Sequence, residues 1–349
     1  MKKTAVLLAL ALTAAVGLCG CGKKEQVQEP EILKVGNMGT SIKAAMVVLA
    51  HEMGYYEEEG LNVEFEQINN LNDGLTAIGT GKMDVLPMGI IPTVTFAAQG
   101  GDYVVFGGTI AEGGEVVVSD EYKDRVKSLE DLEGLTIACV RPETSHMIAE
   151  SLMRDQGLDV DGTTKFVEVD GFQSVIEAVQ KKTADAGFVN SGFGLIARQQ
   201  GLTKAFAIGD VMPGAVCCRQ TTSQKVIDDK RDALVKFQTA NIRAYLLCME
   251  DAETAVKKLM DFSGQDREYV EYCLYDGAMK ITMDPAKNKV LSFYEVMKDN
   301  GDIPEDSKWD GEQNVDITIY KEALDGLKKR LPDNEILKEL EKQYQENNF

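Results

Sequence analysis

Basic residues are scarce in this sequence. Of its 349 residues, 37 are lysine or arginine and 57 are aspartate or glutamate, so the formal net charge at pH 7 is −20. A protein with this excess of negative charge repels phosphate backbones and anionic lipid surfaces. The composition therefore argues against a nucleic acid as partner.

Long apolar runs are missing beyond the N-terminus. No later stretch reaches the ~20 consecutive apolar residues that a membrane-spanning helix requires. Hydrophobic residues still make up 44% of the chain, which is enough for a large core. A chain of this length favours two lobes over one.

The cysteines lack the spacing of a disulfide framework. Cys217 and Cys218 could form a redox pair, but consecutive residues of a strand point to opposite faces, which favours separate buried thiols. Apart from Cys19 and Cys21, the chain contains an odd number of cysteines without regular intervals: Cys139, Cys217, Cys218, Cys248 and Cys273.

Motifs for cofactors and catalysis are incomplete. Residues 192–197 match the glycine spacing of a dinucleotide-binding loop, but they follow the third strand of a unit and not the first. Thr80 stands where a phosphate-binding loop needs lysine, and His51 lacks the second histidine of a zinc-protease helix. No nucleophile has a paired base, so the sequence predicts no catalysis, cofactor or metal.

The N-terminus has the pattern of a bacterial secretion signal. Lys2 and Lys3 precede an apolar run, residues 5–16, that is too short to span a bilayer. The run ends in Leu18-Cys19-Gly20-Cys21, which resembles a lipobox with Cys21 as the lipid-modified residue. The alternative is a buried apolar helix with two core cysteines.

This pattern predicts a signal peptide at residues 1–20 and a lipidated N-terminus with a polar tether at residues 21–31. Two acyl chains on Cys21, at ~0.8 kcal/mol per buried CH₂, would hold the protein on a lipid bilayer. We expect it on the extracytoplasmic face of the cell membrane, which is the periplasmic side if an outer membrane exists.

Hydrophobic periodicity predicts a β-α-β-α-β unit that occurs twice, which is typical of parallel sheets and of a structural repeat. The first unit covers 32–36, 41–59, 61–65, 73–81 and 84–88; the second covers 135–140, 145–156, 165–169, 174–182 and 186–189. Such a repeat favours two α/β lobes that face each other.

Glycine-rich stretches connect the units and are candidate hinge strands, because glycine changes φ at little steric cost. Lobe 1 is expected at 32–110 and 211–349, with lobe 2 at 111–210, and C-terminal helices at 225–261, 266–276, 285–300 and 320–347 are expected to support lobe 1. The candidate hinges are Gly107-Gly108, Gly113-Gly114, Gly209 and Pro213-Gly214.

Several of these segments are similar to one receptor family. Leu33-Lys34-Val35-Gly36 and residues 54–63 (Gly-Tyr-Tyr-Glu-Glu-Glu-Gly-Leu-Asn-Val), with 81–85, 128–134 and 185–189, resemble the nitrate, sulfonate, taurine and thiamine-precursor receptors of ABC importers over residues 32–220. The resemblance implies a type II periplasmic-binding fold with two hinge strands, a ligand cleft between the lobes, and delivery to an ABC permease by a monomer.

One segment departs from the family. Residues 190–193 read Asn-Ser-Gly-Phe, where the family often has an aromatic-acidic-proline run, so the ligand stays open. We expect a small organic or inorganic ligand of anionic character. The same resemblance leaves two alternatives, a ligand sensor for a signalling partner and an enzyme similar to the fungal thiamine-pyrimidine synthase, whose cysteine-rich motif has only Cys217-Cys218 as a counterpart.

Ligand contacts are expected beyond the carboxyl ends of the strands, where open parallel sheets bind ligands. Two Thr-Ser pairs there precede predicted helices, whose free N–H groups favour an anion, although Ser and Thr are also ordinary N-caps. The candidate residues are Met38, Gly39, Thr40, Ser41, Met88, Gly89, Thr144, Ser145, His146, Asn190, Ser191 and Phe193.

Other residues near these loops have two interpretations each. His146 is expected to donate a hydrogen bond to an acidic ligand. Arg141 could pair with a carboxylate or sulfonate, although arginine at a strand exit is usually solvated. Phe172 and Phe193 could stack on an organic ligand, but core packing is the commoner role of phenylalanine.

The lipobox interpretation can be tested by substitution of its two cysteines. Cys21→Ser should release the protein into the soluble fraction, because the acylated thiol is lost, whereas Cys19→Ser should leave it with the membrane. Fractionation followed by immunoblotting measures this difference. If the two variants distribute alike, the assignment of Cys21 is wrong.

Overall fold

Strand β1 (Glu31–Asn37) begins the part of the chain that the computed structural model describes, residues 31–349. The predicted signal peptide, the predicted lipidation of Cys21 and the predicted tether up to residue 30 lie outside the described residues. Strand β1 pairs in parallel with β2 (Leu61–Gln67), as the alternating pattern of residues 61–65 predicts.

The predicted helix over 41–59 is divided into three short helices. These are η1 (Ile42–Ala44), α1 (Ala45–Glu52) and α2 (Tyr55–Glu58). Gly54 separates α1 from α2 with φ of +72°, a left-handed conformation that favours glycine. Helix α3 (Leu71–Gly79) follows β2 as predicted, and α4 (Ile90–Ala98) adds a helix that the periodicity did not indicate.

The predicted strand at 84–88 is reduced to two bridges that join sheets. Val35 bridges to Val85 in parallel, and Leu86 bridges to Thr221 of β9 (Val216–Thr222) in the antiparallel sense. Strand β9 pairs with β3 (Val104–Glu112), which pairs with β10 (Met279–Ile281). The bridges therefore connect β2 and β1 to the β9-β3-β10 ladder.

The second sheet is mixed and has the order β6-β5-β7-β4-β8. Its strands are β4 (Gly114–Val118), β5 (Thr136–Cys139), β6 (Lys165–Glu168), β7 (Ala186–Asn190) and β8 (Thr203–Ala207). Between them lie η2 (Glu130–Leu132), α5 (Thr144–Asp155), α6 (Phe172–Gln180), α7 (Phe193–Gln199) and α8 (Ile208–Val211).

The predicted repeat extends to individual hydrogen bonds. The Asp84 carboxylate accepts the backbone N–H of Lys34 at 2.9 Å, and the Asp185 carboxylate accepts that of Thr136 at 2.8 Å. The N–H of each aspartate in turn donates to the carbonyl of the same partner residue. Each aspartate thus binds the last segment of its unit to the first strand of that unit. This contact explains why both units have an aspartate at the equivalent position.

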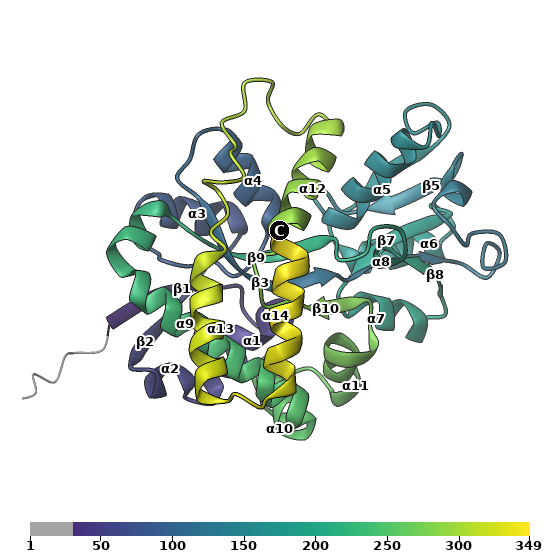
Figure 1. The fold of residues 1–349 in the computed structure, drawn as a ribbon. Helices are drawn as coiled ribbons and strands as arrows, with labels where there is room; N and C mark the ends of the chain where they lie inside the picture. Colours follow the sequence, from purple (N-terminus) through teal and green to yellow (C-terminus); the bar gives the residue numbers. More distant parts are fainter. Residues whose placement is uncertain (1–30) are drawn as a thin grey trace, which may run out of the picture. The chain divides into compact units, whose positions relative to one another are not determined.

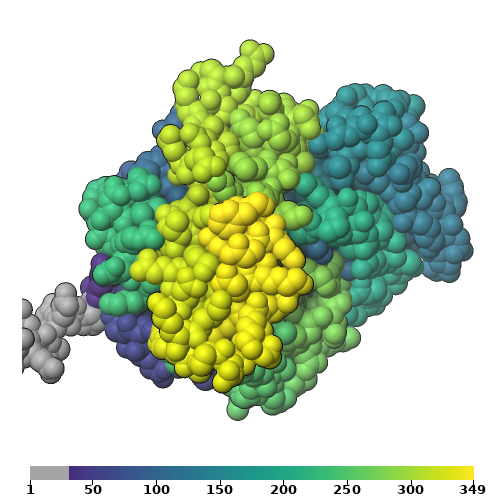
Figure 2. Space-filling view, viewed as in Figure 1, coloured from purple at the N-terminus to yellow at the C-terminus, as the bar shows by residue number. Residues whose placement is uncertain are grey.

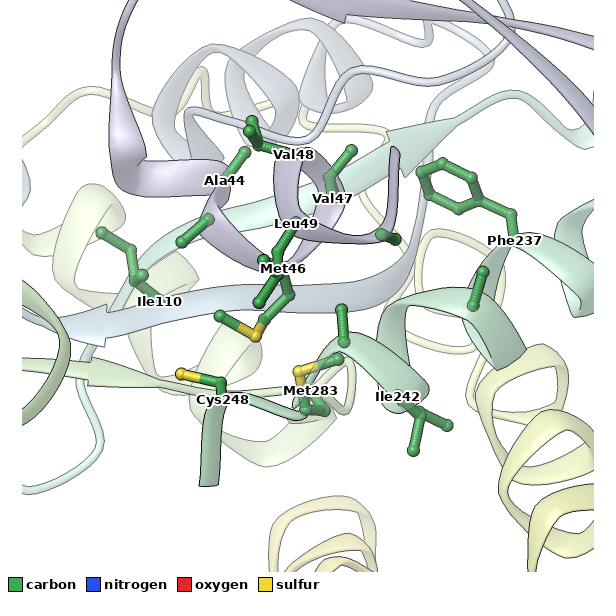
Figure 3. Packing of buried hydrophobic residues seen from close by; sticks show 14 of the residues in the cluster. Ala44, Met46, Val47, Val48, Leu49, Ile110, Phe237, Ile242, Cys248 and Met283 are labelled. Carbon is green, nitrogen blue, oxygen red and sulfur yellow. The ribbon is translucent and has the colours of Figure 1, made fainter. Parts of the chain in front are cut away.

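Helix α1 lies at the centre of the main hydrophobic cluster. It is buried from Ala45 to Ala50 and packs against α9 (Gln224–Glu250) and α10 (Ala252–Ser263). Figure 3 shows side chains of α1, of β3 and of α9 gathered in this cluster, including Met46, Leu49, Ile110 and Phe237.

The C-terminal part of the chain is helical, as predicted. It contains α11 (Arg267–Glu271), the π-helix η3 (Tyr272–Asp276), α12 (Lys287–Asp299), α13 (Thr318–Arg330) and α14 (Glu335–Asn348). Helices α13 and α14 lie side by side in Figure 1, and they form the yellow surface in Figure 2.

Helix α12 does not support the first sheet alone, as we expected of the C-terminal helices. It packs on α5 beside the second sheet (Figure 1). Asn300 at the C-terminus of α12 donates to the Met147 carbonyl at 2.8 Å and accepts from Arg154 at 2.8 Å, and both partners belong to α5.

The glycines at the crossings between the sheets have two separate roles. Gly113 and Gly214 have φ of +87° and +74°, so they use the conformational freedom expected of hinge residues. Gly107 and Gly108 lie inside β3, outside the left-handed region, and glycine is required there because a Cβ would have no space. A Cβ on Gly108 would lie 2.4 Å from the Thr282 carbonyl oxygen and 2.6 Å from that of Asp284.

Two glycine-to-alanine variants should change stability in opposite directions. Gly108→Ala forces β3 away from the 282–284 backbone and should lower the free energy of unfolding by ~1–3 kcal/mol. Gly326→Ala in α13, where a Cβ meets no atom within 4 Å, should raise it by ~0.5–1 kcal/mol. Denaturant unfolding curves measure both, and a neutral Gly108→Ala would contradict the packing argument.

Candidate functional site

A cavity of about 980 Å³ lies at the carboxyl ends of strands from both sheets. Its lining comes from four strand-to-helix connections (38–43, 69–72, 88–92 and 140–144), from Asp170 and Asn190, from Thr95 and Phe96 of α4, and from Cys217 and Cys218 of β9. A smaller hollow of about 320 Å³ adjoins it and shares Met38, Ser41, Lys43 and Asn190. We take the larger cavity as the candidate ligand site.

A second hollow, of about 680 Å³, lies between α9 and α13. Its lining contains several charged residues but none of the strand-end loops on which parallel sheets bind ligands. The strand-end loops therefore favour the cavity of about 980 Å³ over this hollow as the ligand site.

Nine of the twelve predicted contact residues line the two adjoining cavities. The larger contains Met38, Ser41, Met88, Gly89, Thr144 and Asn190, and the smaller adds Thr40, Ser191 and Phe193. Gly39, Ser145 and His146 line neither of them. Ligand contact by any of the twelve stays a prediction.

The N-terminus of α5 is occupied by a carboxylate of the protein itself. Glu143, which is 7% exposed, accepts the N–H groups of Ser145 at 2.9 Å and of His146 at 3.1 Å. It also accepts the Ser145 hydroxyl at 3.0 Å and the Asn190 amide at 2.5 Å. Glu143 therefore uses the donors that we expected an anionic ligand to use at this helix.

Lys43 places a positive charge in the cavity, on the side opposite Glu143. It follows Ser41, whose hydroxyl accepts the Lys43 N–H at 3.4 Å as the predicted helix cap. Burial opposes the charged form, but the neighbouring Cys217 and Cys218, with Glu143 and Tyr269, outweigh it and raise the pKa of Lys43. Lys43 is the single cationic side chain among the described residues that line either cavity.

Cys217 and Cys218 both line the cavity, contrary to the expectation that adjacent strand residues face opposite sides. The cause is a bulge in β9, where Cys218 pairs with Ile110 but the next pair joins Val216 to Ala111. Cys217 is therefore an extra residue, and the alternation of side chains is interrupted there. The two Sγ atoms lie 3.7 Å apart.

The two thiols have different acidities. A hydrogen bond from the Cys217 thiol, aided by Lys43, the Gly89 N–H and Arg219, lowers the pKa of Cys218 to about 6 against the effect of burial. Gly89 is the N-cap of α4, where the helix dipole also favours negative charge. The same hydrogen bond and burial raise the pKa of Cys217.

His146 faces away from the cavity into a cluster with Glu150. Its ring is 1% exposed, contacts Phe166 edge-on, and places Nε2 3.1 Å from the Glu150 carboxylate. Burial favours the neutral ring, but Cys139 and Glu150 outweigh it and raise the pKa of His146 to about 9. Arg141 lies 3.4 Å from the same carboxylate, so it serves this cluster and does not line the cavity.

The two phenylalanines pack in the core, as their commoner role predicts, and stacking on a ligand stays a prediction. Phe172 and Phe193 pack against each other with centroids 5.3 Å apart and line the smaller hollow. They also pack against the apolar cluster of the second sheet. Lys43 Nζ lies 5.9 Å from the centre of the Phe172 ring.

Several lining residues were missed by our sequence analysis. The loop after β2 contributes Asn69 and Asn70, the first turn of α3 contributes Asn72, and Asp170 comes from the loop after β6. These segments follow the second strand of each unit, so the rule that ligands bind beyond strand ends applies to them as well. Lys43 lies two residues beyond Ser41, the last residue of the first predicted segment.

The fold is shared with solved binding proteins. A ligand-binding component of an ABC-type import system from Staphylococcus aureus, with zinc bound, has a TM-score of 0.67 at 16% identity, over 84% of this chain and 99% of that chain. The periplasmic aliphatic sulphonate binding protein SsuA from Escherichia coli has a TM-score of 0.65 at 17% identity, over 82% and 92% of the two chains.

The periplasmic nitrate-binding protein NrtA from Synechocystis PCC 6803 has a TM-score of 0.68 at 15% identity, over 86% of this chain and 89% of that chain. The predicted fold class, the periplasmic-binding-protein fold, is therefore confirmed. Residues 41–255 match the model of the NMT1/THI5 like family, and the chain belongs to that family. No curated protein matches it in sequence.

Within residues 31–349, every helix is too short or too polar to cross a bilayer.

The His146–Glu150 pair should make stability depend on pH in a defined direction. Because the folded state raises the pKa of His146 to about 9, its contribution is complete below the usual ~6.5 and is lost as the pH rises through about 9. The Glu150 pKa is lowered to about 2 by His146 and Arg154 despite burial. Its contribution is lost as the pH falls from ~4.3 toward that value.

Nuclear magnetic resonance can follow this titration, because the chain has only two histidines. In a His51→Gln background, the His146 ring should stay protonated up to about pH 9. Glu150→Gln should move its midpoint toward ~6.5, while Glu177→Gln on α6 should leave it unchanged. A midpoint near 6.5 in the parent would contradict the proposed pairing.

Proposed function

We propose that this protein is an extracytoplasmic solute-binding lipoprotein. It captures a small ligand in the cavity between the two sheets and delivers it to an ABC permease, acting as a monomer. The observation that carries the proposal is the cavity of about 980 Å³ at the strand ends, lined from both sheets. The lipobox at Cys21 supports an anchor on the outer face of the membrane.

The cavity favours an organic ligand over a small inorganic ion. Its volume lies at the upper end of the ~300–1,000 Å³ that pockets for small molecules occupy. Much of its lining is apolar, with Leu71, Ile90, Phe96 and Val140 among its residues. Among the described residues that line the cavity, Lys43 is the one cation, so we propose a ligand with one anionic group and an apolar body.

The polar lining supports recognition of further acceptors or donors on the ligand. Asn69, Asn70 and Asn72 line the cavity at one loop. Asn190 is already engaged, because its amide donates to Glu143 and its oxygen accepts from Ser191. Asn70 is engaged as well, because its side chain accepts the Asp73 N–H and donates to the Asp73 carboxylate. We therefore propose that Asn69 and Asn72, more than Asn70 or Asn190, supply the variable hydrogen bonds to the ligand.

Ligand capture is proposed to close two lobes, with lobe 1 at 32–110 and 211–349 and lobe 2 at 111–210. The left-handed Gly113 and Gly214 lie at the two crossings and supply the hinge. Lys43 comes from the first lobe and Glu143 from the second, so that closure brings the opposite sides of the cavity onto one ligand.

We further propose that binding occurs without catalysis. The two histidines are the usual bases for a nucleophile, and neither lines the cavity in the described chain: His146 pairs with Glu150, and His51 packs edge-on against Phe65. This favours a receptor over an enzyme of the thiamine-pyrimidine-synthase type. A sensor function would use the same cavity and closure.

Lys43 should be required for binding an anionic organic ligand. A thermal-shift screen with sulfonates and carboxylates of increasing apolar size should identify ligands that stabilise the protein more than nitrate does. Lys43→Met should then weaken binding by ~10–100-fold, because an ionic hydrogen bond contributes ~1.5–3 kcal/mol. Isothermal titration calorimetry measures the dissociation constants.

Lys82→Met is the matched control, because Lys82 is exposed and lies outside the cavity. Binding by this variant should equal that of the parent. The proposal fails if nitrate binds more tightly than every organic anion, or if the Lys43 and Lys82 variants behave alike.

A further inference from the structure

The Cys217–Cys218 pair presents two sulfur atoms to the same cavity. Cys217 and Cys218 are 6% and 4% exposed, and both line the large cavity, with Sγ atoms 3.7 Å apart. The bulge in β9 is responsible, since it places an extra residue at Cys217. Regular pairing would have directed the two thiols to opposite faces of the sheet.

A disulfide between these neighbours would be strained. Adjacent Cα atoms lie ~3.8 Å apart, which is shorter than the ~4.4–6.8 Å usual for disulfide-bonded residues. A strained disulfide is easily reduced. The backbone therefore favours the dithiol form and leaves two sulfurs available to a third atom.

The distance between the two Sγ atoms suits a metal ion that is bound to both. An ion ~2.3 Å from each of two sulfurs that are 3.7 Å apart has a sulfur–ion–sulfur angle of ~107°, which is close to tetrahedral. Two-coordinate linear binding at the same bond length would need a separation of ~4.6 Å. The geometry therefore fits a divalent ion of the zinc and cadmium kind, with positions left open.

We propose that Cys217 and Cys218 form a chelating site for a soft divalent cation inside the cavity. On binding, two sulfur–metal bonds form, and each thiol that carries a proton releases it to solvent. No electron transfer is involved.

The surrounding charges allow such an ion. Lys43 and Glu143 both line the cavity and carry opposite charges, so their effects on a bound cation offset each other. A divalent ion balances the charge of two thiolates. Among residues 31–349, no third His, Cys, Asp or Glu completes a metal cluster. The open positions face a cavity that Met38 and Met88 also line, and thioethers are ligands for soft metals.

Cadmium is the direct probe, because thiolate-to-cadmium charge transfer absorbs in the ultraviolet. The protein is the full chain with Cys19→Ser and Cys21→Ser, so that the five described thiols alone remain. Titration in the presence of a non-thiol reductant should saturate at one ion per chain. Cys217→Ser and Cys218→Ser should each weaken binding by ~100-fold or more, because the chelate is lost.

Cys248→Ser and Cys273→Ser are the matched controls, since both thiols are buried away from the cavity. Their cadmium affinity should equal that of the parent. An absent charge-transfer band, or binding that survives both Cys217→Ser and Cys218→Ser, would overturn the proposal.

A second experiment keeps Cys217 and Cys218 unchanged, so its result does not depend on whether a variant folds. Alkylation followed by mass spectrometry should modify Cys217 and Cys218 first, and cadmium should protect these two residues alone. Protection of other cysteines instead would also overturn the site.

The metal site does not depend on the proposed solute. Lys43→Met should weaken binding of organic anions and retain cadmium, whereas Cys218→Ser should weaken cadmium binding. A parent protein that binds organic anions but no cadmium overturns the metal site alone, and one that binds cadmium but no organic anion overturns the proposed solute alone.

Discussion

The buried guanidinium of Arg219 holds together the strands on which the site is built. The residue is 0% exposed and donates to the carbonyl oxygens of Pro285 at 3.0 Å, Ile110 at 2.9 Å and Cys218 at 2.8 Å. A buried charge without partners costs several kcal/mol, so these acceptors must stay in place. They fix β9 against β3 at the bulge, and the bulge decides where both cysteine sulfurs point.

The two repeated units are alike in framework and opposite in charge at the cavity. Asp84 and Asp185 make equivalent contacts to the first strand of their units. Where the chain enters the first helix, however, one unit presents the ammonium of Lys43, and the other uses the carboxylate of Glu143 as its cap. A duplicated scaffold therefore yields an asymmetric site, which can orient a ligand that has unlike ends.

Most strands and helices of the two repeated units were predictable because they depend on local periodicity, as for β2 and α5, whereas α4 and the division of 41–59 into three helices were not. Most strand-end loops of the cavity followed from the same pattern. Three features depend on distant partners and had no local signal: the inward turn of Glu143, the bulge at Cys217, and the contact of Gly108 with the 282–284 backbone. The glycine-rich stretches were visible in the sequence. The sequence alone does not distinguish a glycine required for its positive φ from one required because a Cβ would clash with neighbouring atoms.

Helix α12 gives the two sheets a third connection besides the two strand crossings. The chain leaves β10, packs α12 on α5, and returns to α13 beside the first sheet. Two crossings alone would permit rotation, twist and shear. A third attachment, held by Asn300 to Met147 and Arg154, would restrain the last two motions. If the lobes close as proposed, the axis of closure is expected to pass close to α12.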